Sequence, residues 1–267
     1  MHDVTSAADG AGRPGDPADS GAGATAVTRA EPDGPDRTSA LGSPTGLNTV
    51  AGWDRPFADR RDAGRVLAAC LAGAVRPGVF VLGLPRGGAV VAAEVAAVLA
   101  APLDVLVVRK LGVPWQPELA MGAVAAAGDE VETIRIDDVV QEARIDDEVF
   151  SRIRDAEVAE LHRRQLAYRD GRPPPDVRGR PVILVDDGLA TGATMRAAVA
   201  AVRGEGVTAV TVAVPAGSPR AVHRLLGEAD EVVCLRTPPD FGSVGRCYRD
   251  FAPTSDDEVR ACLRGRP

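Results

Sequence analysis

The sequence predicts an α/β protein built on an open, Rossmann-like parallel sheet with helices on both faces. Short β-branched apolar runs, bounded by Gly, Pro or Asp, alternate with alanine-rich segments of helical character. A parallel sheet requires this order of elements. The chain has 267 residues, 45% of them hydrophobic, which is enough to bury a large core. These observations exclude a peptide-like or collagen-like chain.

Residues 1–50 are expected to form a disordered tail. They hold eight Gly, five Pro, seven acidic residues and no aromatic residue. Such a composition buries too little apolar surface to offset the entropy of the chain. Residues 51–267 then form the folded domain.

The folded part is expected to begin with a helix over about residues 57–75. In this helix Phe57, Leu67 and Leu71 can share one face. Five short apolar runs are typical of buried strands, at 79–84, 104–108, 181–185, 209–214 and 231–235. Further helices are expected at 89–100, 193–203 and 219–226.

One stretch interrupts this alternation. Residues 122–136 can form a hairpin, and the charge-dense residues 137–170 predict a helical insertion. Gly171 and the prolines at 173–175 end it. The domain is therefore expected to carry an insertion beside its sheet.

The charge of the chain argues against duplex DNA or RNA as its main partner. The net charge is -7; the tail carries three Arg and seven acidic residues, a charge of -4, which leaves -3 for the rest, so the folded part is nearly balanced. Lys110 is the single lysine among 31 basic residues. We attribute the abundance of arginine to GC-rich coding and treat it as background.

The cysteines and the hydropathy pattern favour a soluble cytoplasmic protein. Cys70, Cys234, Cys247 and Cys262 form no C-x-x-C pair, so we expect reduced thiols. No stretch approaches the roughly 20 apolar residues of a membrane span, so no membrane partner is expected.

The strongest functional signal is V-I-L-V-D-D-G-L-A-T-G-A-T at residues 182–194. A buried strand leads into Asp186 and Asp187 at the sheet edge where open α/β folds bind ligands, so the acids can reach a diol or a metal-bound ligand. The Gly-Thr-rich turn then opens a helix, whose N–H groups and the hydroxyls of Thr191 and Thr194 suit a phosphate. The turn lacks the lysine of a P-loop. A merely capped turn would explain neither the second acid nor the second threonine.

In this run the sequence resembles the type I phosphoribosyltransferases. The resemblance covers about residues 79–235 and implies the fold of that family, with a hood over the sheet edge. It implies that Asp186 and Asp187 hold the 2- and 3-hydroxyls of the ribose of phosphoribosyl pyrophosphate. It also implies that the following loop binds the 5-phosphate, through Gly188, Leu189, Ala190, Thr191, Gly192, Ala193 and Thr194.

A second loop, G-L-P-R-G-G at residues 83–88, follows a predicted strand and opens a helix. In the family the corresponding loop binds pyrophosphate, which here implicates Pro85, Arg86, Gly87 and Gly88. Arg86 can pair with phosphate oxygens through two parallel hydrogen bonds. Taken alone, the run is equally typical of an ordinary turn.

The third stretch, residues 107–121, is expected to be a strand end followed by an irregular loop. It holds Arg109 and Lys110. In several phosphoribosyltransferases a basic pair at this place begins a mobile loop that closes over pyrophosphate, so both are candidate catalytic residues. The alternative is a solvated basic pair at a strand end. Trp115 receives no role.

By this resemblance, magnesium pyrophosphate is displaced from C1 of the ribose by a nitrogen acceptor of the nucleobase class. Asp187 is the candidate to accept the proton of the acceptor. Mg²⁺ would be carried mainly by pyrophosphate and ribose oxygens, because the sequence holds no His or Cys cluster at ligand spacing. His162 and His223 are expected to face solvent.

The acceptor and its hood stay open at this stage. The hood can come from the insertion at 137–170 or from the C-terminal segment at 241–267, whose first eleven residues hold three of the seven Phe and Tyr residues. The main alternative function is a regulatory protein of the same fold that binds phosphoribosyl pyrophosphate or a nucleotide without turnover. A phosphosugar hydrolase is a weaker one, and a homodimer is an open alternative to a monomer.

Overall fold

The computed structural model describes residues 47–48, 55–73, 76–126 and 131–264. The chain divides into two compact units, Met1–Ser39 and Ala40–Pro267, and the described residues belong to the second. The tail predicted at residues 1–50 therefore lies outside the described residues, except for Leu47 and Asn48. These two residues form a short strand of the main sheet.

The second unit contains a six-stranded sheet in which every neighbouring pair of strands is parallel. The spatial order is β1-β9-β8-β7-β2-β3. The strands are β1 (Leu47–Asn48), β2 (Phe80–Gly83), β3 (Leu103–Val105), β7 (Pro181–Val185), β8 (Ala209–Val214) and β9 (Glu231–Cys234). The predicted open α/β sheet is confirmed.

Strands β2 and β7 are neighbours at the point where the strand order reverses. β2 leads along the chain to β3 on one side, and β7 leads to β8 on the other. In open parallel sheets a crevice opens at such a point, outside the C-terminal ends of the strands. The loops after β2 and β7 are therefore brought together by the topology.

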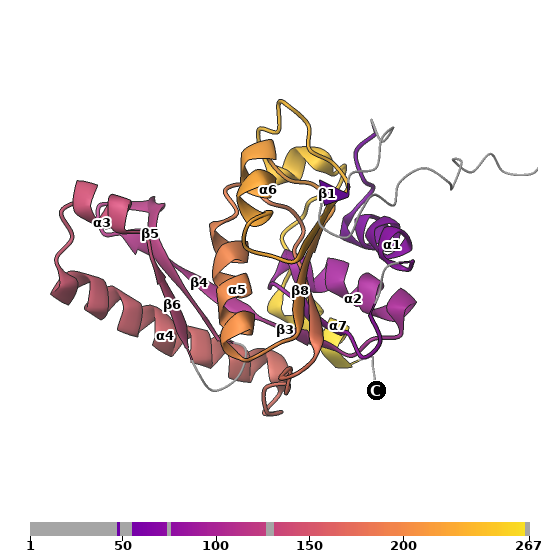
Figure 1. Ribbon diagram of the computed structural model, residues 1–267, viewed down its shortest axis with the longest axis horizontal. Helices are drawn as coiled ribbons and strands as arrows, with labels where there is room; N and C mark the ends of the chain where they lie inside the picture. Colours follow the sequence, from indigo (N-terminus) through magenta and orange to yellow (C-terminus); the bar gives the residue numbers. More distant parts are fainter. Residues whose placement is uncertain (1–46, 49–54, 74–75, 127–130, 265–267) are drawn as a thin grey trace, which may run out of the picture. The chain divides into compact units, whose positions relative to one another are not determined.

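Helices cover both faces of the sheet (Figure 1). One face carries α1 (Arg60–Leu71) and α2 (Gly87–Leu99), and the other carries α5 (Ala193–Gly204) and α6 (Pro219–Leu225). Three of these helices begin or end within two residues of the predicted bounds. The first helix is shorter than predicted, because Asp59 caps it by accepting a hydrogen bond from the backbone N–H of Asp62.

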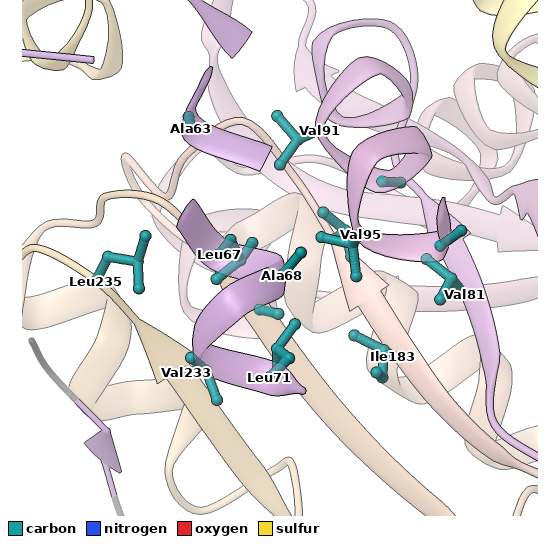
Figure 2. Packing of buried hydrophobic residues seen from close by; sticks show 14 of the residues in the cluster. Ala63, Leu67, Ala68, Leu71, Val81, Val91, Val95, Ile183, Val233 and Leu235 are labelled. Carbon is teal, nitrogen blue, oxygen red and sulfur yellow. The ribbon is translucent and has the colours of Figure 1, made fainter. Parts of the chain in front are cut away.

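The core beneath α1 and α2 is made of small and β-branched side chains. Figure 2 shows Leu67 and Leu71 of α1 and Val95 of α2 packed toward Val81 and Ile183 of the sheet. All five are at most 3% exposed. The helix beginning at Gly87 is thereby fixed over the sheet, which holds its N-terminus at the end of β2.

The irregular loop predicted within residues 107–121 is wrong, because this stretch is a β-hairpin. β4 (Val107–Val113), β5 (Gln116–Ala126) and β6 (Glu132–Arg135) form a separate antiparallel sheet in the order β4-β5-β6. The hairpin predicted at 122–136 is confirmed as the β5–β6 pair. The β4–β5 pairing tolerates Gly112 through a shift of register on either side of it.

The helical insertion predicted at 137–170 is confirmed as α3 (Asp137–Glu142) and α4 (Asp147–Arg169). α4 packs on β4 and β5 (Figure 1). At its C-terminal end the buried guanidinium of Arg169 donates from Nε to Asp104 at 3.2 Å and from Nη2 to the main-chain oxygen of Val105 at 3.0 Å. This buried ion pair attaches the end of the insertion to β3.

The described C-terminal part contains a short 3-10 helix, η1 (Val244–Cys247), and α7 (Asp256–Arg264). None of the helices within the described residues has the length and apolar content to cross a membrane. The four cysteines all lie in described parts of the chain and form no disulfide.

Candidate active site

Two neighbouring carboxylates stand at the C-terminal end of β7, as the sequence predicts. β7 ends at Val185, and the backbone N–H of Asp187 donates to Oδ1 of Asp186 at 2.8 Å. Desolvation, and then the charge of Asp187, raise the pKa of Asp186 well above its ordinary value. Burial also raises the pKa of Asp187, although Arg60 opposes this shift. Burial therefore favours the protonated form of both acids, and Arg60 favours the ionised form of Asp187.

The structure brings the G-L-P-R-G-G loop against these acids. A Cβ built on Gly88 would lie 2.8 Å from both Cα and Oδ1 of Asp186, and one on Gly87 would lie 1.9 Å from Oδ2 of Asp187. Only a residue without a side chain permits this approach. The peptide bond between Pro85 and Arg86 in this loop is cis.

The loop after the acids leads directly into the N-terminus of α5. Gly192 precedes the helix with φ +80° and has no side chain that could cap it. Thr191 and Thr194 are exposed, and Oγ1 of Thr191 accepts from the N–H of Ala193 at 3.4 Å. Leu189 is buried and fixed by main-chain hydrogen bonds to the turn after β8. This is a helix N-terminus held open toward the sheet edge, suited to an anion.

Arg60, at the start of α1, joins the site, although the sequence interpretation did not select it. Its Nε donates to Oδ2 of Asp187 at 2.8 Å, and its Nη1 donates to the main-chain oxygen of Ala252 at 2.7 Å. Its guanidinium lies 3.9 Å from the ring centroid of Phe251. The adjacent arginines 60 and 61 were the available signal, but the abundance of arginine obscured it.

The C-terminal aromatic segment lies against the acids. The phenol of Tyr248 donates to the main-chain oxygen of Asp187 at 2.6 Å, and its ring contacts those of Phe57 and Phe251. Burial raises the pKa of Tyr248, which keeps it a hydrogen-bond donor at neutral pH. Val244 packs over Gly188, where a Cβ would lie 2.5 Å from its Cγ1. Of the two candidate hood segments, this one contacts the acids.

Phe57 therefore does not lie on a helix face, as the sequence analysis expected. It precedes α1 and forms an isolated bridge with Tyr248. Its 2% exposure comes from packing in the core cluster beneath α1 and α2, to which Tyr248 and Cys247 also belong. The N-terminal and C-terminal ends of the domain thus meet beside the acids.

Arg86 lies in the second loop and is half-exposed. Its Nη1 is 3.9 Å from Oδ1 of Asp256, the first residue of α7, and the same oxygen accepts from the phenol of Tyr168 on α4 at 3.0 Å. Asp256 therefore stands between the loop and the insertion. A bound anion would compete with Asp256 for the Arg86 guanidinium.

Arg109 and Lys110 lie within β4 rather than in a loop, and their side chains alternate across the strand. Arg109 lies on the face toward α4 and donates from Nε to Glu157 at 2.7 Å. Lys110 pairs in register with Ala123, which packs against Ala197 and Ala201 of α5. Lys110 therefore belongs to the face shared with α5, the helix that the phosphate-type loop opens, and Arg109 does not.

The two histidines and Trp115, which the sequence analysis left without a role in the site, are exposed. His162 and His223 are both exposed, which confirms that they face solvent. Trp115 is 66% exposed at the tip of the β4–β5 hairpin. Within the described ranges, no three His, Cys, Asp or Glu side chains gather as a metal cluster would require.

Comparison with known proteins identifies the family of the chain. The model of the phosphoribosyl transferase domain matches residues 62–251. A Mycobacterium tuberculosis H37Rv protein with the provisional name phosphoribosyl transferase Rv0571c is 51% identical over 207 residues, which are 78% of this chain and 46% of that protein. The corresponding protein of strain CDC 1551 shows the same values. The chain thus spans about half the length of the curated relatives it matches.

A solved structure is similar over most of this chain. The crystal structure of TT1426 from Thermus thermophilus has 46% sequence identity to it and a TM-score of 0.67. The match covers 78% of this chain and 97% of TT1426.

Proposed function

Because the chain belongs to the phosphoribosyl transferase domain family, we propose that it is an enzyme that transfers a phosphoribosyl group from phosphoribosyl pyrophosphate. The acceptor is a nitrogen atom of a small molecule of the nucleobase class. In this reaction the bond between C1 of the ribose and the pyrophosphate oxygen breaks, and the pyrophosphate leaves with the electron pair. A C1–N bond forms, and the nitrogen loses its proton.

One observation carries this proposal: two glycines of the first loop directly abut the two acids of the second. A donor that carries a phosphate at one end and a pyrophosphate at the other needs two anion sites on either side of a sugar site. The N-termini of α2 and α5 would supply two such anion sites, and Asp186 and Asp187, at the start of the loop that opens α5, face the loop that opens α2.

In the proposed complex the acids bind the ribose and the loop before α5 binds the 5-phosphate. Carboxylates accept hydrogen bonds from the 2- and 3-hydroxyls of the sugar. The amides of residues 190–194, with the hydroxyls of Thr191 and Thr194, donate to the phosphate oxygens. This arrangement would position C1 without covalent chemistry from the protein.

The leaving pyrophosphate belongs to the loop at residues 85–88. Arg86 would leave Asp256 to pair with the pyrophosphate, adding charge-assisted hydrogen bonds as negative charge develops. Lys110 lies on the face of β4 toward α5, and it would reach the pyrophosphate by movement of β4 and β5 toward the loop at residues 85–88. Arg109 would first have to leave Glu157.

Asp187 is the proposed acceptor of the proton from the nucleophilic nitrogen. To do this it must be ionised. Burial raises the pKa of Asp187, and the ion pair with Arg60 opposes that shift by favouring the ionised form. A base would lie near the C-terminal segment around Tyr248 and Phe251, because this segment contacts the acids through Tyr248 and through Arg60.

Magnesium is proposed as the partner of the pyrophosphate. Mg²⁺ prefers oxygen ligands, retains several waters and commonly binds through substrate phosphates. The described residues offer two carboxylates here and no third acidic, His or Cys ligand, which fits an ion brought in with the substrate. Its chemistry would be to neutralise charge on the leaving group.

The test is mass spectrometry of the full chain incubated with Mg²⁺, phosphoribosyl pyrophosphate and a mixed pool of purines, pyrimidines and other nitrogen compounds. Asp187→Asn should make no new product. Asp176→Asn is the matched control, because Asp176 is an exposed loop residue that precedes β7 at the other end of that strand. A new ribonucleotide from the wild type and the control alone would support the transferase and identify its acceptor.

Two other results would overturn the proposal. Release of pyrophosphate with ribose 5-phosphate and no ribonucleotide would indicate a phosphosugar hydrolase. Binding of phosphoribosyl pyrophosphate without turnover, with every acceptor tested, would indicate a regulatory protein of the same fold.

A further inference from the structure

Arg60 makes three different contacts with one guanidinium. Its Nε donates to Asp187, its Nη1 donates to the main-chain oxygen of Ala252, and its plane lies over the ring of Phe251. The side chains of Arg60 and Asp187 are 12% and 16% exposed, so this ion pair is largely shielded from water. Three segments that are distant in sequence therefore meet at one side chain.

The geometry of this contact indicates that Arg60 fixes the orientation of the Asp187 carboxyl group in addition to neutralising its charge. The planar guanidinium offers donors in fixed directions, and only Nε is directed at the carboxylate. Since Nη1 and the ring of Phe251 hold the guanidinium plane, the plane in turn restricts the rotation of the Asp187 carboxyl group. A lysine would keep the charge but could not reproduce these three contacts.

The surroundings of Asp187 hold few other charged groups. On its own loop lies Asp186, on the C-terminal segment the phenol of Tyr248, and on α1 the guanidinium of Arg60. The loop that opens α2 presents Gly87 to it, while Arg86 of that loop pairs with Asp256. Among the described residues, Arg60 is thus the cationic side chain that donates a hydrogen bond to the Asp187 carboxylate.

We propose that Arg60 is a positioning residue of the transfer reaction: it orients Asp187 as an ionised carboxylate and couples that orientation to docking of the segment from Tyr248 to Ala252. This inference rests on the proposed function. Arg60 acts through Asp187 and through the C-terminal segment. The start of α1 thereby becomes part of the catalytic apparatus.

The adjacent Arg61 provides a matched control. It lies on the same helix turn and pairs with Glu94 of α2 at 2.9 Å, and its side chain is 56% exposed. Arg61→Gln removes an equal charge from α1 without touching Asp187. Arg60→Gln removes the charge at Asp187, and Arg60→Lys retains the charge while losing the fixed donor directions.

The experiment measures kcat and KM against pH for the wild type and these three variants. For Arg60→Gln we expect kcat near neutral pH to fall by about 10²-fold, the loss typical of a misplaced reacting group. The acidic limb of its kcat/KM profile should also move to higher pH by about one to three units, because the opposite charge is lost. KM for phosphoribosyl pyrophosphate should change far less than kcat.

The other two variants separate charge from geometry. Arg60→Lys should keep the acidic limb near its wild-type position and lose kcat, and Arg61→Gln should match the wild type. An acidic limb that stays in place in Arg60→Gln, or an equal loss of kcat in Arg61→Gln, would overturn the proposal. So would a wild-type kcat in Arg60→Gln.

A second measurement does not depend on turnover. Titration of ¹³C-labelled aspartate side chains by NMR, with Asp187 assigned by Asp187→Asn, follows the carboxyl group directly. We expect the pKa of Asp187 to rise by about one to three units in Arg60→Gln and to stay unchanged in Arg61→Gln. An unchanged pKa in Arg60→Gln would overturn the inference even in an active enzyme. If the wild type makes no ribonucleotide, the proposed function fails. The NMR titration still tests whether Arg60 sets the pKa of Asp187.

Discussion

Gly87 approaches Asp187 so closely that a Cβ on the glycine would lie 1.9 Å from Oδ2 of the carboxylate. The same Cβ would lie 2.6 Å from Nε of Arg60. The contact joins the loop after β2 to the loop after β7, and thus the two candidate anion sites to each other. Glycine at this place is a requirement of the site itself, since any side chain would separate Arg60 from Asp187.

Gly88→Ala should destabilise the fold. A Cβ at Gly88 would lie 2.8 Å from Cα of Asp186 and from the main-chain oxygen of Val185, so backbone atoms would have to move. Overpacking of this kind costs about 1–3 kcal/mol, which urea denaturation can measure. Gly73→Ala is the control, because no atom lies within 4 Å of a Cβ there. Equal stabilities of the two variants would contradict the tight contact between the loops.

Asp186→Asn should stabilise the protein in a pH-dependent way. The pKa of Asp186 is raised in the folded state above an unfolded value of about 3.9, so between these values the folded protein binds more protons than the unfolded one. Its free energy of unfolding therefore falls as pH rises through this window, by up to about 1.4 kcal/mol per unit of pKa difference. The Asn variant lacks this loss and can still accept from the N–H of Asp187.

The stability advantage of Asp186→Asn should accordingly grow as the pH rises above the unfolded-state pKa of about 3.9 toward the raised pKa of the folded state. Urea denaturation across this range measures it, with the exposed Asp240→Asn as the control. If the difference in free energy of unfolding between the variant and the wild type stays constant with pH, then ionisation of Asp186 does not destabilise the fold.

Tyr248→Phe should lower the free energy of unfolding by about 1 kcal/mol, because it removes the hydrogen bond to the main-chain oxygen of Asp187 and leaves that oxygen without its donor. It should also lower kcat, since the bond fixes the backbone of a candidate catalytic residue. Tyr168→Phe, which removes a bond to Asp256 at α7, is the comparison. A larger loss of kcat in Tyr168→Phe would place the important contact elsewhere.

The sequence was sufficient to predict β2, β7, β8 and β9 and the loops at the sheet edge. The run expected at 104–108 divides between β3 and β4 of two different sheets, and β1 lies in the predicted tail. Residues 181–185 and 209–214 are largely apolar runs with turn residues on both sides. Such short runs are typical of strands that are buried on both faces of a parallel sheet. The two glycine-rich loops follow such strands directly, so their neighbourhood depends only on parallel topology. For these strands and loops, the sequence pattern alone indicates the structure that the whole fold adopts.

The parts that could not be predicted depend on packing between distant residues. Gly112, Pro114 and Pro117 suggest a loop, whereas burial of Leu111 and Val113 against the insertion holds this stretch in strands. Arg60 and Asp187 are 127 positions apart, and neither residue's neighbours in sequence indicate the pairing. Tertiary contacts override local signals in both cases.

Lys110→Ala should lower kcat more than it raises KM for phosphoribosyl pyrophosphate, if β4 and β5 close over the leaving group as a hairpin. Because Lys110 shares its face with α5 and Arg109 is held by Glu157 on the opposite face, Arg109→Ala should affect stability more than the rate of transfer. Steady-state kinetics combined with thermal melting of both variants separates the two effects. If Lys110→Ala raises KM and leaves kcat unchanged, then movement of β4 and β5 does not contribute to kcat. In that case the two strands would form a rigid side of the site.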